Sequence, residues 1–162
     1  RVHQYVEIGI KEGAKLECGG RAATGKGLQH GFFYHPTVFT EVNPEMTIMK
    51  EEIFGPVVCL MPVRDLEDAI RQVNNTVYGL SAALYSRDVN RAMRAIRDIE
   101  TGITYINGPT IGTEVHLPFG GVKNTGNGHR EAGETAIDIF SEWKSVFVDF
   151  SGRLQKAQID VD

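Results

Sequence analysis

The chain has 162 residues, of which 41% are apolar and 23% charged, and it carries a formal net charge of −4. This composition is typical of a soluble globular protein of about one domain, long enough to bury a core. The acidic balance offers no basic face for nucleic acid. No run of about 18 apolar residues occurs, so the sequence predicts no membrane span.

The first residues lack an initiator Met and the layout of a signal peptide, as expected of a piece cut from a longer polypeptide. The two cysteines, Cys18 and Cys59, lie far apart and form no Cys-x-x-Cys pattern. This argues against a zinc site or a disulfide scaffold and favours structural thiols in a reducing cytosol. The five histidines show no metal-ligand spacing, so we predict no metal site.

In the first 42 residues, apolar side chains from Val2 to Ile10 follow helical spacing and end before Gly13. Residues 14–18 predict a short strand, and the glycine-rich stretch 21–31 predicts an exposed loop. The aromatic and β-branched residues 32–42 predict extended chain. Because proline cannot donate to a sheet, Pro36 should confine this segment to an edge or an irregular piece.

Residues 49–58 place two acids beside Phe54, followed by a Gly-Pro turn and the apolar run 57–63, which is typical of a buried strand. Such a turn could hold a carboxylate and a ring over a ligand. A carboxylate can accept hydrogen bonds from a pair of hydroxyls, and an aromatic face can pack on a flat heterocycle. These residues alone favour the simpler interpretation, an acidic turn with an anchoring Phe.

From 55 to 107 the pattern alternates strand, helix, strand, helix, strand, which predicts an α/β fold with a parallel sheet and flanking helices. Asp65 should cap a helix that pairs Glu67 with Arg71, and Asp88 should cap the next helix. The inward faces expected for the two helices are Leu66, Ala69, Ile70 and Val73, and then Val89, Ala92, Met93, Ile96 and Ile99. Ligands should sit beyond the carboxyl ends of the strands, near Asn107 or the 123–128 loop.

The glycine-rich stretch 117–128 could cradle an anion through its backbone N–H groups and Lys123, and a plain flexible loop is an equal alternative. Residues 130–139 predict a short helix. The β-prone segment 140–150 has apolar residues on both faces and should lie against another sheet. That sheet could belong to a second subunit or to this chain itself.

Taken together, several motifs resemble the C-terminal part of the NAD(P)-dependent aldehyde dehydrogenase family. They are Glu-Glu-Ile-Phe-Gly-Pro-Val at 51–57, Asn-Asn-Thr-Val-Tyr-Gly-Leu-Ser at 74–81, Asn107, Pro-Phe-Gly-Gly-Val-Lys at 118–123 and Gly-Asn-Gly-His-Arg-Glu at 126–131. The resemblance implies that residues 1–140 are the C-terminal half of the catalytic domain. It also implies that residues 141–162 are an oligomerisation strand and tail.

The resemblance further implies a reaction in which a cysteine thiolate attacks an aldehyde, hydride passes to nicotinamide, and a glutamate activates water to hydrolyse the thioester. Carried over by motif, Glu52 would hold the nicotinamide-ribose hydroxyls, Phe54 would pack near the nicotinamide, and Phe119 would wall the substrate pocket. Asn107 would be a supporting residue. The implied cofactor is NAD or NADP, held mostly by a missing N-terminal domain. The implied assembly is a cytoplasmic homo-oligomer joined through residues 141–150.

The chain also departs from the family pattern. The motifs around the nucleophilic cysteine and the basic glutamate are absent, so no catalytic residue is assigned here and the isolated chain should be inactive. His129 stands where the family often runs from Gly directly to Arg. Two alternatives remain, an interaction module that uses the 140–150 strand and a reductase of activated acids on the same scaffold. The Glu-Ile-Phe-Gly-Pro motif is more typical of the oxidising family.

Overall fold

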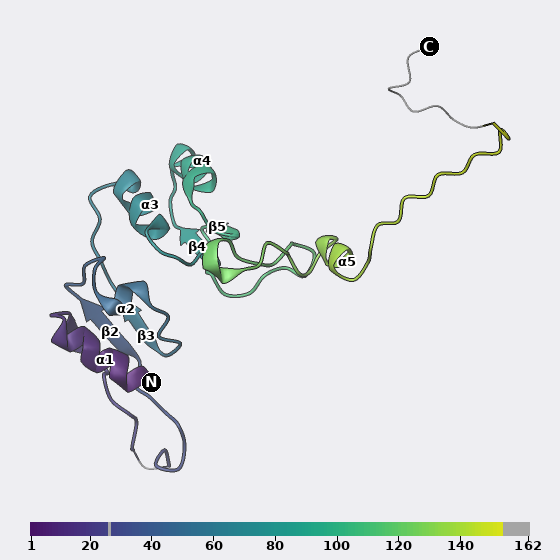
Figure 1. The fold of residues 1–162 in the computed structure, drawn as a ribbon. Helices are drawn as coiled ribbons and strands as arrows, with labels where there is room; N and C mark the ends of the chain where they lie inside the picture. The colour runs from purple at the N-terminus through teal and green to yellow at the C-terminus, as the bar shows by residue number, and fades with distance from the viewer. Residues whose placement is uncertain (26, 154–162) are drawn as a thin grey trace.

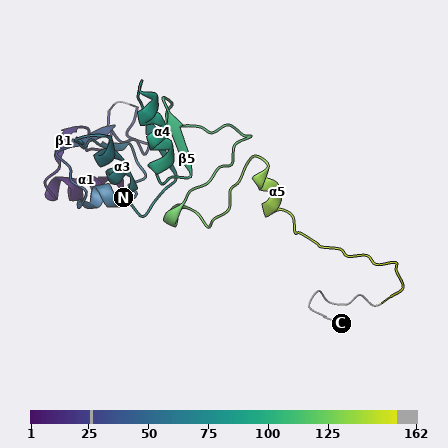
Figure 2. The same ribbon diagram turned by 90° about the horizontal axis from the view of Figure 1, so that it is seen from above.

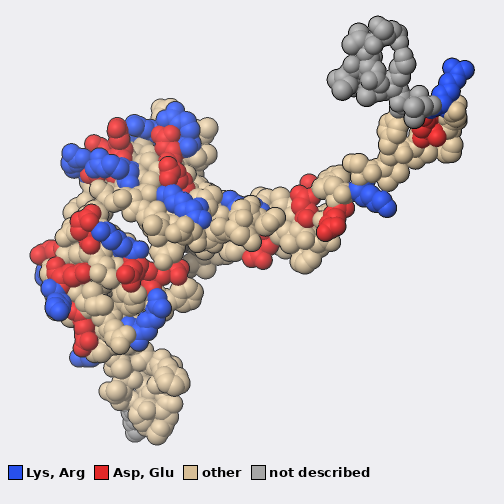
Figure 3. Space-filling view, in the orientation of Figure 1, with Lys and Arg blue, Asp and Glu red and all other residues tan. Residues whose placement is uncertain are grey.

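The computed structural model describes residues 1–25 and 27–153 (Figure 1). Two small regions of helices and strands follow one another along the chain, and a long C-terminal arm leaves the second (Figures 1 and 2). Acidic and basic side chains are interspersed over both regions on the face that Figure 3 shows. Within the described ranges, no helix is long and apolar enough to cross a membrane.

The N-terminal region contains α1 (Val2–Lys11), β1 (Lys15–Cys18), β2 (Thr37–Thr40), α2 (Thr47–Lys50) and β3 (Val57–Cys59). Its three strands form a sheet in the order β1-β2-β3, with β1 antiparallel and β3 parallel to β2. The predicted first helix and first strand are therefore confirmed.

The core of this region lies where α1 and α2 meet the sheet. Phe39 and Val6 are fully buried there, and Ile48 of α2 packs with them. A Cβ atom at Gly9 would lie 2.8 Å from Ile48 Cδ1, so the glycine allows the two helices to approach closely. Burial of a large apolar side chain contributes about 2 kcal/mol, so this cluster is the main stabilising element of the region.

Of the two outcomes expected for the segment with Pro36, the sheet edge is wrong and the irregular piece is present, because residues 32–36 form no strand beyond an isolated bridge at Tyr34. β2 is the central strand, and it begins at Thr37, one residue after the proline. The proline therefore never has to donate within the sheet, while Thr37 N–H donates to the Pro56 carbonyl at 2.8 Å. The buried Thr37 hydroxyl accepts from Gly20 N–H and donates to the His35 carbonyl, both at 2.9 Å.

The second region contains α3 (Leu66–Asn74), β4 (Ser81–Leu84), α4 (Val89–Asp98) and β5 (Ile103–Ile106). β4 and β5 pair in parallel along their whole length. Both predicted caps are confirmed, because the Asp65 carboxylate accepts from Asp68 N–H and the Asp88 carboxylate accepts from Asn90 N–H, each at 2.8 Å.

The parallel α/β class is confirmed, but the alternation from 55 to 107 does not form one three-stranded sheet. β3 pairs with the upstream strand β2 and not with β4. The Phe39 carbonyl accepts from Leu60 N–H at 2.9 Å, which extends the β2–β3 contact beyond the strand itself. β3 is also shorter than the predicted run 57–63, in which Val58, Leu60 and Val63 are 49%, 52% and 43% exposed.

The predicted inward faces of the helices are partly wrong. In α4, Val89, Met93 and Ile96 are exposed and Ala95 is buried instead, while Val73 of α3 is also exposed. The helix faces that periodicity marks as apolar are thus only partly covered within the described residues.

The predicted pairing of Glu67 with Arg71 is also wrong. Arg71 pairs with Asp68 on its own helix, and Glu67 reaches across to Arg94 of α4 at 3.2 Å. The side chain of Asp68 is nearly buried between Arg64 and Arg71, so it competes successfully for the second arginine.

After β5 the chain forms long loops, a 3-10 turn η1 (Lys123–Thr125) and the short helix α5 (Thr135–Ile139). The predicted helix 130–139 is therefore present in its second half. From residue 140 to 153 the arm is extended and pairs with no strand in the part of the chain that the structure describes (Figure 1). Trp143, Phe147 and Phe150 are each more than 80% exposed. Residues 154–162 of the predicted tail lie outside the described residues.

Candidate functional site

The turn that carries Glu52 and Phe54 joins α2 to β3. Phe54 has a φ of 56°, in the left-handed region where non-glycine residues are uncommon. A Cβ atom at Gly55 would lie 2.5 Å from Val2 Cγ2, so helix α1 packs against the turn where a side chain is absent. The Pro56 carbonyl accepts from Thr37, which ties the turn to the central strand. The result is a fixed turn that presents the Phe54 ring 83% exposed.

The two neighbouring acids of this turn differ in their partners. The Glu51 carboxylate accepts a hydrogen bond from the Tyr5 hydroxyl at 2.7 Å, and this bond raises the pKa of Tyr5. Glu52 is held through its backbone, because its carbonyl accepts from Arg1 Nη2 at 2.6 Å. Its exposed carboxylate makes no hydrogen bond within residues 1–25 and 27–153. Of the two acids, Glu52 is therefore the one available to a ligand.

An available carboxylate and an exposed ring, two residues apart on a tethered turn, fit a nucleoside. The carboxylate can accept from both hydroxyls of a ribose, and the ring can pack on a flat heterocycle. The strained φ of Phe54 is consistent with a functional position, since such strain concentrates at binding sites.

At the carboxyl ends of β4 and β5, Asn107 fastens the two strands together. Its Nδ2 donates to the Ser86 carbonyl at 2.9 Å, and its Oδ1 accepts from Ser86 N–H at 2.8 Å. Asn107 N–H also donates to the Leu84 carbonyl at 2.8 Å. Asn107 has a φ of 56°, so this clamp holds a second strained backbone position. Both ends of its amide are engaged with the Ser86 backbone. The supporting role near the catalytic chamber stays a prediction.

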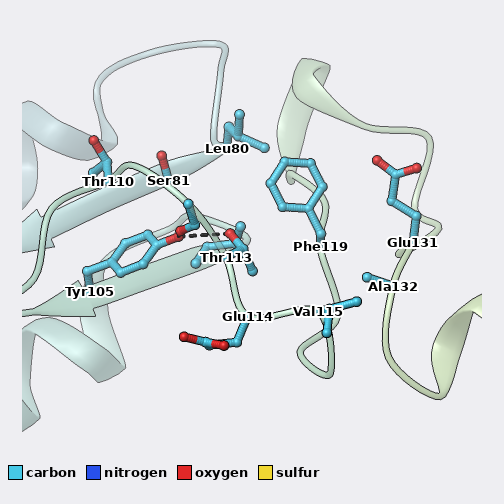
Figure 4. Close-up of a pocket in the computed structure, with 12 residues that line it drawn as sticks. Leu80, Ser81, Tyr105, Thr110, Thr113, Glu114, Val115, Phe119, Glu131 and Ala132 are labelled. Carbon is cyan, nitrogen blue, oxygen red and sulfur yellow. Dashed lines mark hydrogen bonds between the residues drawn. The ribbon is translucent and has the colours of Figure 1, made fainter.

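Beside β4 and β5 lies a cavity of about 610 Å³ (Figure 4). The strands line it mainly with their first residues, Ser81 and Ile103, so it lies away from the carboxyl ends that Asn107 joins. Its wall is formed by the two strands, the loop after β5 and the segment around Phe119; the lining residues are Leu80, Ser81, Ile103, Tyr105, Thr110, Gly112, Thr113, Glu114, Val115, Phe119, Glu131 and Ala132. The cavity is mostly apolar with a few polar groups, as is common for small-molecule sites.

Two contacts shape this cavity. The Tyr105 hydroxyl donates to the Gly112 carbonyl at 2.6 Å and lies 2.9 Å from the Thr113 hydroxyl, which fixes the loop after β5. Phe119 and Glu131 exchange two backbone hydrogen bonds, at 2.6 and 2.8 Å, which fix the opposite wall. Phe119 was predicted from the sequence, whereas Tyr105 and Thr113 were not. The available signal was a tyrosine, which carries a hydroxyl, within the β-prone run 103–106.

The structure separates the sequence-predicted residues into two places. Phe119 lines the cavity, whereas Glu52 and Phe54 lie on the N-terminal region and do not contribute to its lining. The cofactor and substrate roles assigned to these three residues remain predictions.

The glycine-rich stretch is neither an anion cradle around Lys123 nor a plain flexible loop. Lys123 Nζ donates to the Asn74 carbonyl at 2.7 Å and pairs with Glu100 at 3.0 Å. A Cβ atom at Gly102 would lie 1.8 Å from the Gly120 carbonyl oxygen, so backbone packs directly on backbone here. The stretch is a structural connection between β5 and the loops that form the cavity.

Neither cysteine lines the cavity. Burial raises the pKa of the Cys59 thiol, and its Sγ lies 4.0 Å from the Ile48 carbonyl. The exposed Cys18 has its Sγ 3.9 Å from the Pro36 carbonyl. A raised pKa reduces the thiolate fraction, so Cys59 is a poor nucleophile and suits a structural role.

Residues 1–146 match the model of a protein family described as the aldehyde dehydrogenase family. The chain is 42% identical over 151 residues to aldehyde dehydrogenase 1A1 of Oryctolagus cuniculus, covering 93% of this chain and 29% of that protein. It is 40% identical to the alpha-ketoglutaric semialdehyde dehydrogenase of Bacillus subtilis, covering 89% of this chain and 30% of the relative.

Superposition on solved structures supports the same family. The chain superimposes on a Mycobacterium tuberculosis aldehyde dehydrogenase complexed with NAD+ with a TM-score of 0.85 and 41% identity, covering 95% of this chain and 31% of that one. It also superimposes on the betaine aldehyde dehydrogenase of Staphylococcus aureus with a TM-score of 0.82 and 32% identity, covering 86% of this chain and 27% of that one. The chain thus spans about 30% of the length of the relatives it matches.

Proposed function

Because this chain belongs to the aldehyde dehydrogenase family, we propose that it forms part of an enzyme that oxidises an aldehyde to a carboxylic acid with NAD or NADP. The reaction would pass through a thioester on a cysteine that lies outside this chain. The observation that supports the proposal most is the superposition of 95% of the chain on an NAD+-bound family member at 41% identity.

In this proposal the turn before β3 contacts the cofactor. The Glu52 carboxylate accepts hydrogen bonds from the nicotinamide-ribose hydroxyls, and the Phe54 ring packs near the nicotinamide. The Glu52 carboxylate, which has no hydrogen-bond partner in the described part of the chain, and the exposed Phe54 ring fit this role. When bound, the cofactor supplies a hydride acceptor.

The cavity beside β4 and β5 forms part of the substrate pocket. Phe119, Leu80 and Val115 provide apolar contact for the carbon chain of the aldehyde. The Tyr105 hydroxyl keeps the loop after β5 in place, and Asn107 keeps the strand ends together. These residues orient the substrate rather than react with it, because none of them is a nucleophile in an activating environment.

The extended arm supplies a subunit contact in the proposed enzyme. Trp143, Phe147 and Phe150 are almost fully exposed on a segment without a strand partner in the described residues. Burying such a segment against a second copy would cover its apolar side chains and pair its backbone. The two free cysteines suit the reducing cytosol as the compartment.

The first test uses the 162-residue chain alone. Mixed with NAD or NADP and a panel of aldehydes, it should form no reduced cofactor, because Cys59 is unactivated and the motifs of the family nucleophile and base are absent. Formation of reduced cofactor at a rate that Cys18→Ala or Cys59→Ala abolishes would contradict the assignment of the nucleophile to another segment.

The second test asks whether the chain can complete a family member. In a chimera, this chain replaces the corresponding 31% of the Mycobacterium tuberculosis enzyme. The chimera should oxidise at least one neutral aliphatic aldehyde. A chimera that folds and binds NAD+ yet oxidises no aldehyde would overturn the proposed function.

A further inference from the structure

The chain contains two Asn-Gly pairs, Asn107-Gly108 and Asn127-Gly128. Such a pair is prone to spontaneous deamidation, in which the backbone nitrogen of the glycine attacks the side-chain amide carbon of the asparagine. Glycine favours this attack because it has no Cβ atom to hinder its own nitrogen. The same two residues form both pairs, so a large difference in their reactivity has to come from the fold.

At the first pair, the asparagine side chain is held by a different part of the chain. Asn107 Nδ2 donates to the Ser86 carbonyl at 2.9 Å, and its Oδ1 accepts from Ser86 N–H at 2.8 Å. Because Ser86 follows the neighbouring strand β4, these bonds direct the amide across the strand pair and not toward the Gly108 nitrogen. Attack by that nitrogen requires both hydrogen bonds to break first.

At the second pair, the asparagine side chain folds back over its own backbone. Asn127 Oδ1 accepts from His129 N–H at 3.1 Å, which is the local turn in which an asparagine bonds the backbone two residues ahead. The amide carbon then lies over the peptide group in between, whose nitrogen belongs to Gly128.

Nothing in the described part of the chain holds the reacting groups of this pair back. Within residues 1–25 and 27–153, neither Asn127 Nδ2 nor Gly128 N–H makes a hydrogen bond. A Cβ atom placed at Gly128 would meet no other atom within 4 Å, and both residues are exposed. The leaving group and the nucleophile are therefore both open to solvent, and water can reach the product.

We propose that Asn127 is a site of spontaneous deamidation and that the fold protects Asn107 from the same reaction. The Gly128 nitrogen bonds to Asn127 Cγ, the Cγ–Nδ2 bond breaks, and the proton lost by the nitrogen leaves with Nδ2 as ammonia. The bond from His129 N–H stabilises the negative charge that develops on Oδ1. Water then opens the five-membered imide at either carbonyl and leaves an aspartyl or isoaspartyl residue at position 127. One water is consumed, one ammonia is released and no electrons are transferred.

The reaction changes a surface next to the segment that carries Phe119. Asn127 lines a small cavity of about 320 Å³ together with Phe119 and Glu131. The product adds a negative charge at this cavity, and the isoaspartyl form also lengthens the backbone by one carbon atom. The proposal does not depend on the oxidation of an aldehyde, so it can be tested independently of the proposed function.

The test compares the two pairs within one sample. The full 162-residue chain is incubated at mildly alkaline pH in water enriched in oxygen-18, and circular dichroism verifies that it is folded. Each deamidation incorporates one oxygen-18 atom, which peptide mass spectrometry with fragmentation locates. We expect position 127 to be labelled at least about tenfold faster than position 107, because only Asn127 is held in a geometry suited to attack.

Two controls accompany this measurement. In concentrated urea the Ser86 contact and the local turn are both lost, so the two positions should be labelled at rates within about threefold of each other. Asn127→Gln should abolish the label at position 127 and leave that at position 107 unchanged, because the longer side chain would have to close a less favourable six-membered ring.

Three results would overturn the proposal. Equal labelling of the two positions in the folded chain would show that the Ser86 contact does not protect Asn107. Label that reaches position 127 in urea but not in the folded chain would show that the loop protects Asn127 instead. A tenfold difference that persists in urea would assign the preference to neighbouring residues in the sequence and not to the fold.

Discussion

The amide of Asn107 binds both backbone groups of Ser86, donating to its carbonyl at 2.9 Å and accepting from its N–H at 2.8 Å. This reciprocal pair joins the turn after β4 to the turn after β5 at the carboxyl edge of the sheet. One side chain therefore links the two turns at this edge, in addition to the backbone bond from Asn107 N–H to the Leu84 carbonyl at 2.8 Å.

Replacement of Asn107 by Ala should lower the free energy of unfolding by about 1–3 kcal/mol, because two hydrogen bonds are lost and the left-handed backbone is strained without the amide. Urea denaturation followed by circular dichroism measures the change. Asn90→Ala on the exposed first turn of α4 is the control and should change stability by less than about 0.5 kcal/mol. Equal effects of the two variants would show that the Ser86 contact contributes nothing.

Asp68 should make the stability of the second region depend on pH in the acidic range. Hydrogen bonds from Arg64 hold the pKa of Asp68 at about 2, below its ordinary value of 3.8. A carboxyl whose pKa is lower in the folded chain stabilises the fold above its unfolded pKa, and this stability is lost as the pH falls from about 4 through about 2.

The change that tests this is Asp68→Asn, which should flatten the fall in melting temperature between pH 4 and pH 2 while lowering the melting temperature at pH 7. Asp138→Asn on α5 is the control. In this variant the melting temperature should fall between pH 4 and pH 2 as steeply as in the original chain. If the melting temperature of Asp68→Asn falls between pH 4 and pH 2 as steeply as that of the original chain, Asp68 is not the cause of the acid sensitivity.

Glu52 and Glu51 should differ in their effect on the cofactor. In the chimera with the Mycobacterium tuberculosis enzyme, Glu52→Gln should lower kcat/KM for NAD by about tenfold or more, because a charged acceptor to two hydroxyls is lost. Glu51→Gln should leave that parameter within about twofold, because the Glu51 carboxylate bonds to Tyr5. A larger loss of kcat/KM in Glu51→Gln than in Glu52→Gln would contradict the proposed contact between Glu52 and the ribose.

Gly102 should be far less tolerant of a side chain than Gly108, although the two glycines flank the same strand, β5. A Cβ atom at Gly102 would lie 1.8 Å from a backbone oxygen of Gly120, whereas at Gly108 the nearest atom is Tyr105 Cδ1 at 3.9 Å. We expect Gly102→Ala to cost about 2–4 kcal/mol of unfolding free energy and Gly108→Ala less than about 1 kcal/mol. Urea denaturation measures the free energy of unfolding of the two variants. Similar losses of stability in both would contradict the close approach of the Gly102 and Gly120 backbones.

The arm should control assembly if it is a subunit contact. Removal of residues 141–162 should convert an oligomer of the full chain into a monomer, as measured by size-exclusion chromatography with light scattering. Trp143→Lys with Phe147→Lys should act in the same direction, because charges would interrupt an apolar contact. Ser151→Lys, near the end of the described arm, is the control. A full chain that stays monomeric at high concentration would argue against the contact.

The features that depend on a few neighbouring residues could be predicted from the order of the amino acids. Helical spacing before Gly13, the capping carboxylates Asp65 and Asp88, and the parallel pair of strands after them were all predicted and are all present. The family motifs were also identifiable from sequence, since each is a contiguous run of residues. Caps and periodicity act within one or two helical turns, so their physical cause is local.

How distant segments meet could be seen only in the folded chain. β3 pairs with β2 rather than with β4, and Val89, Met93 and Ile96 are exposed. The Glu51 carboxylate accepts from the Tyr5 hydroxyl, whereas the Glu52 carboxylate has no hydrogen bond among residues 1–25 and 27–153. Periodicity marks a face as apolar but does not say which segment covers it, and two adjacent acids look alike until a distant hydroxyl binds one of them. Contacts between residues far apart in the chain settle these questions, because the geometry of the whole fold determines which groups come within bonding distance.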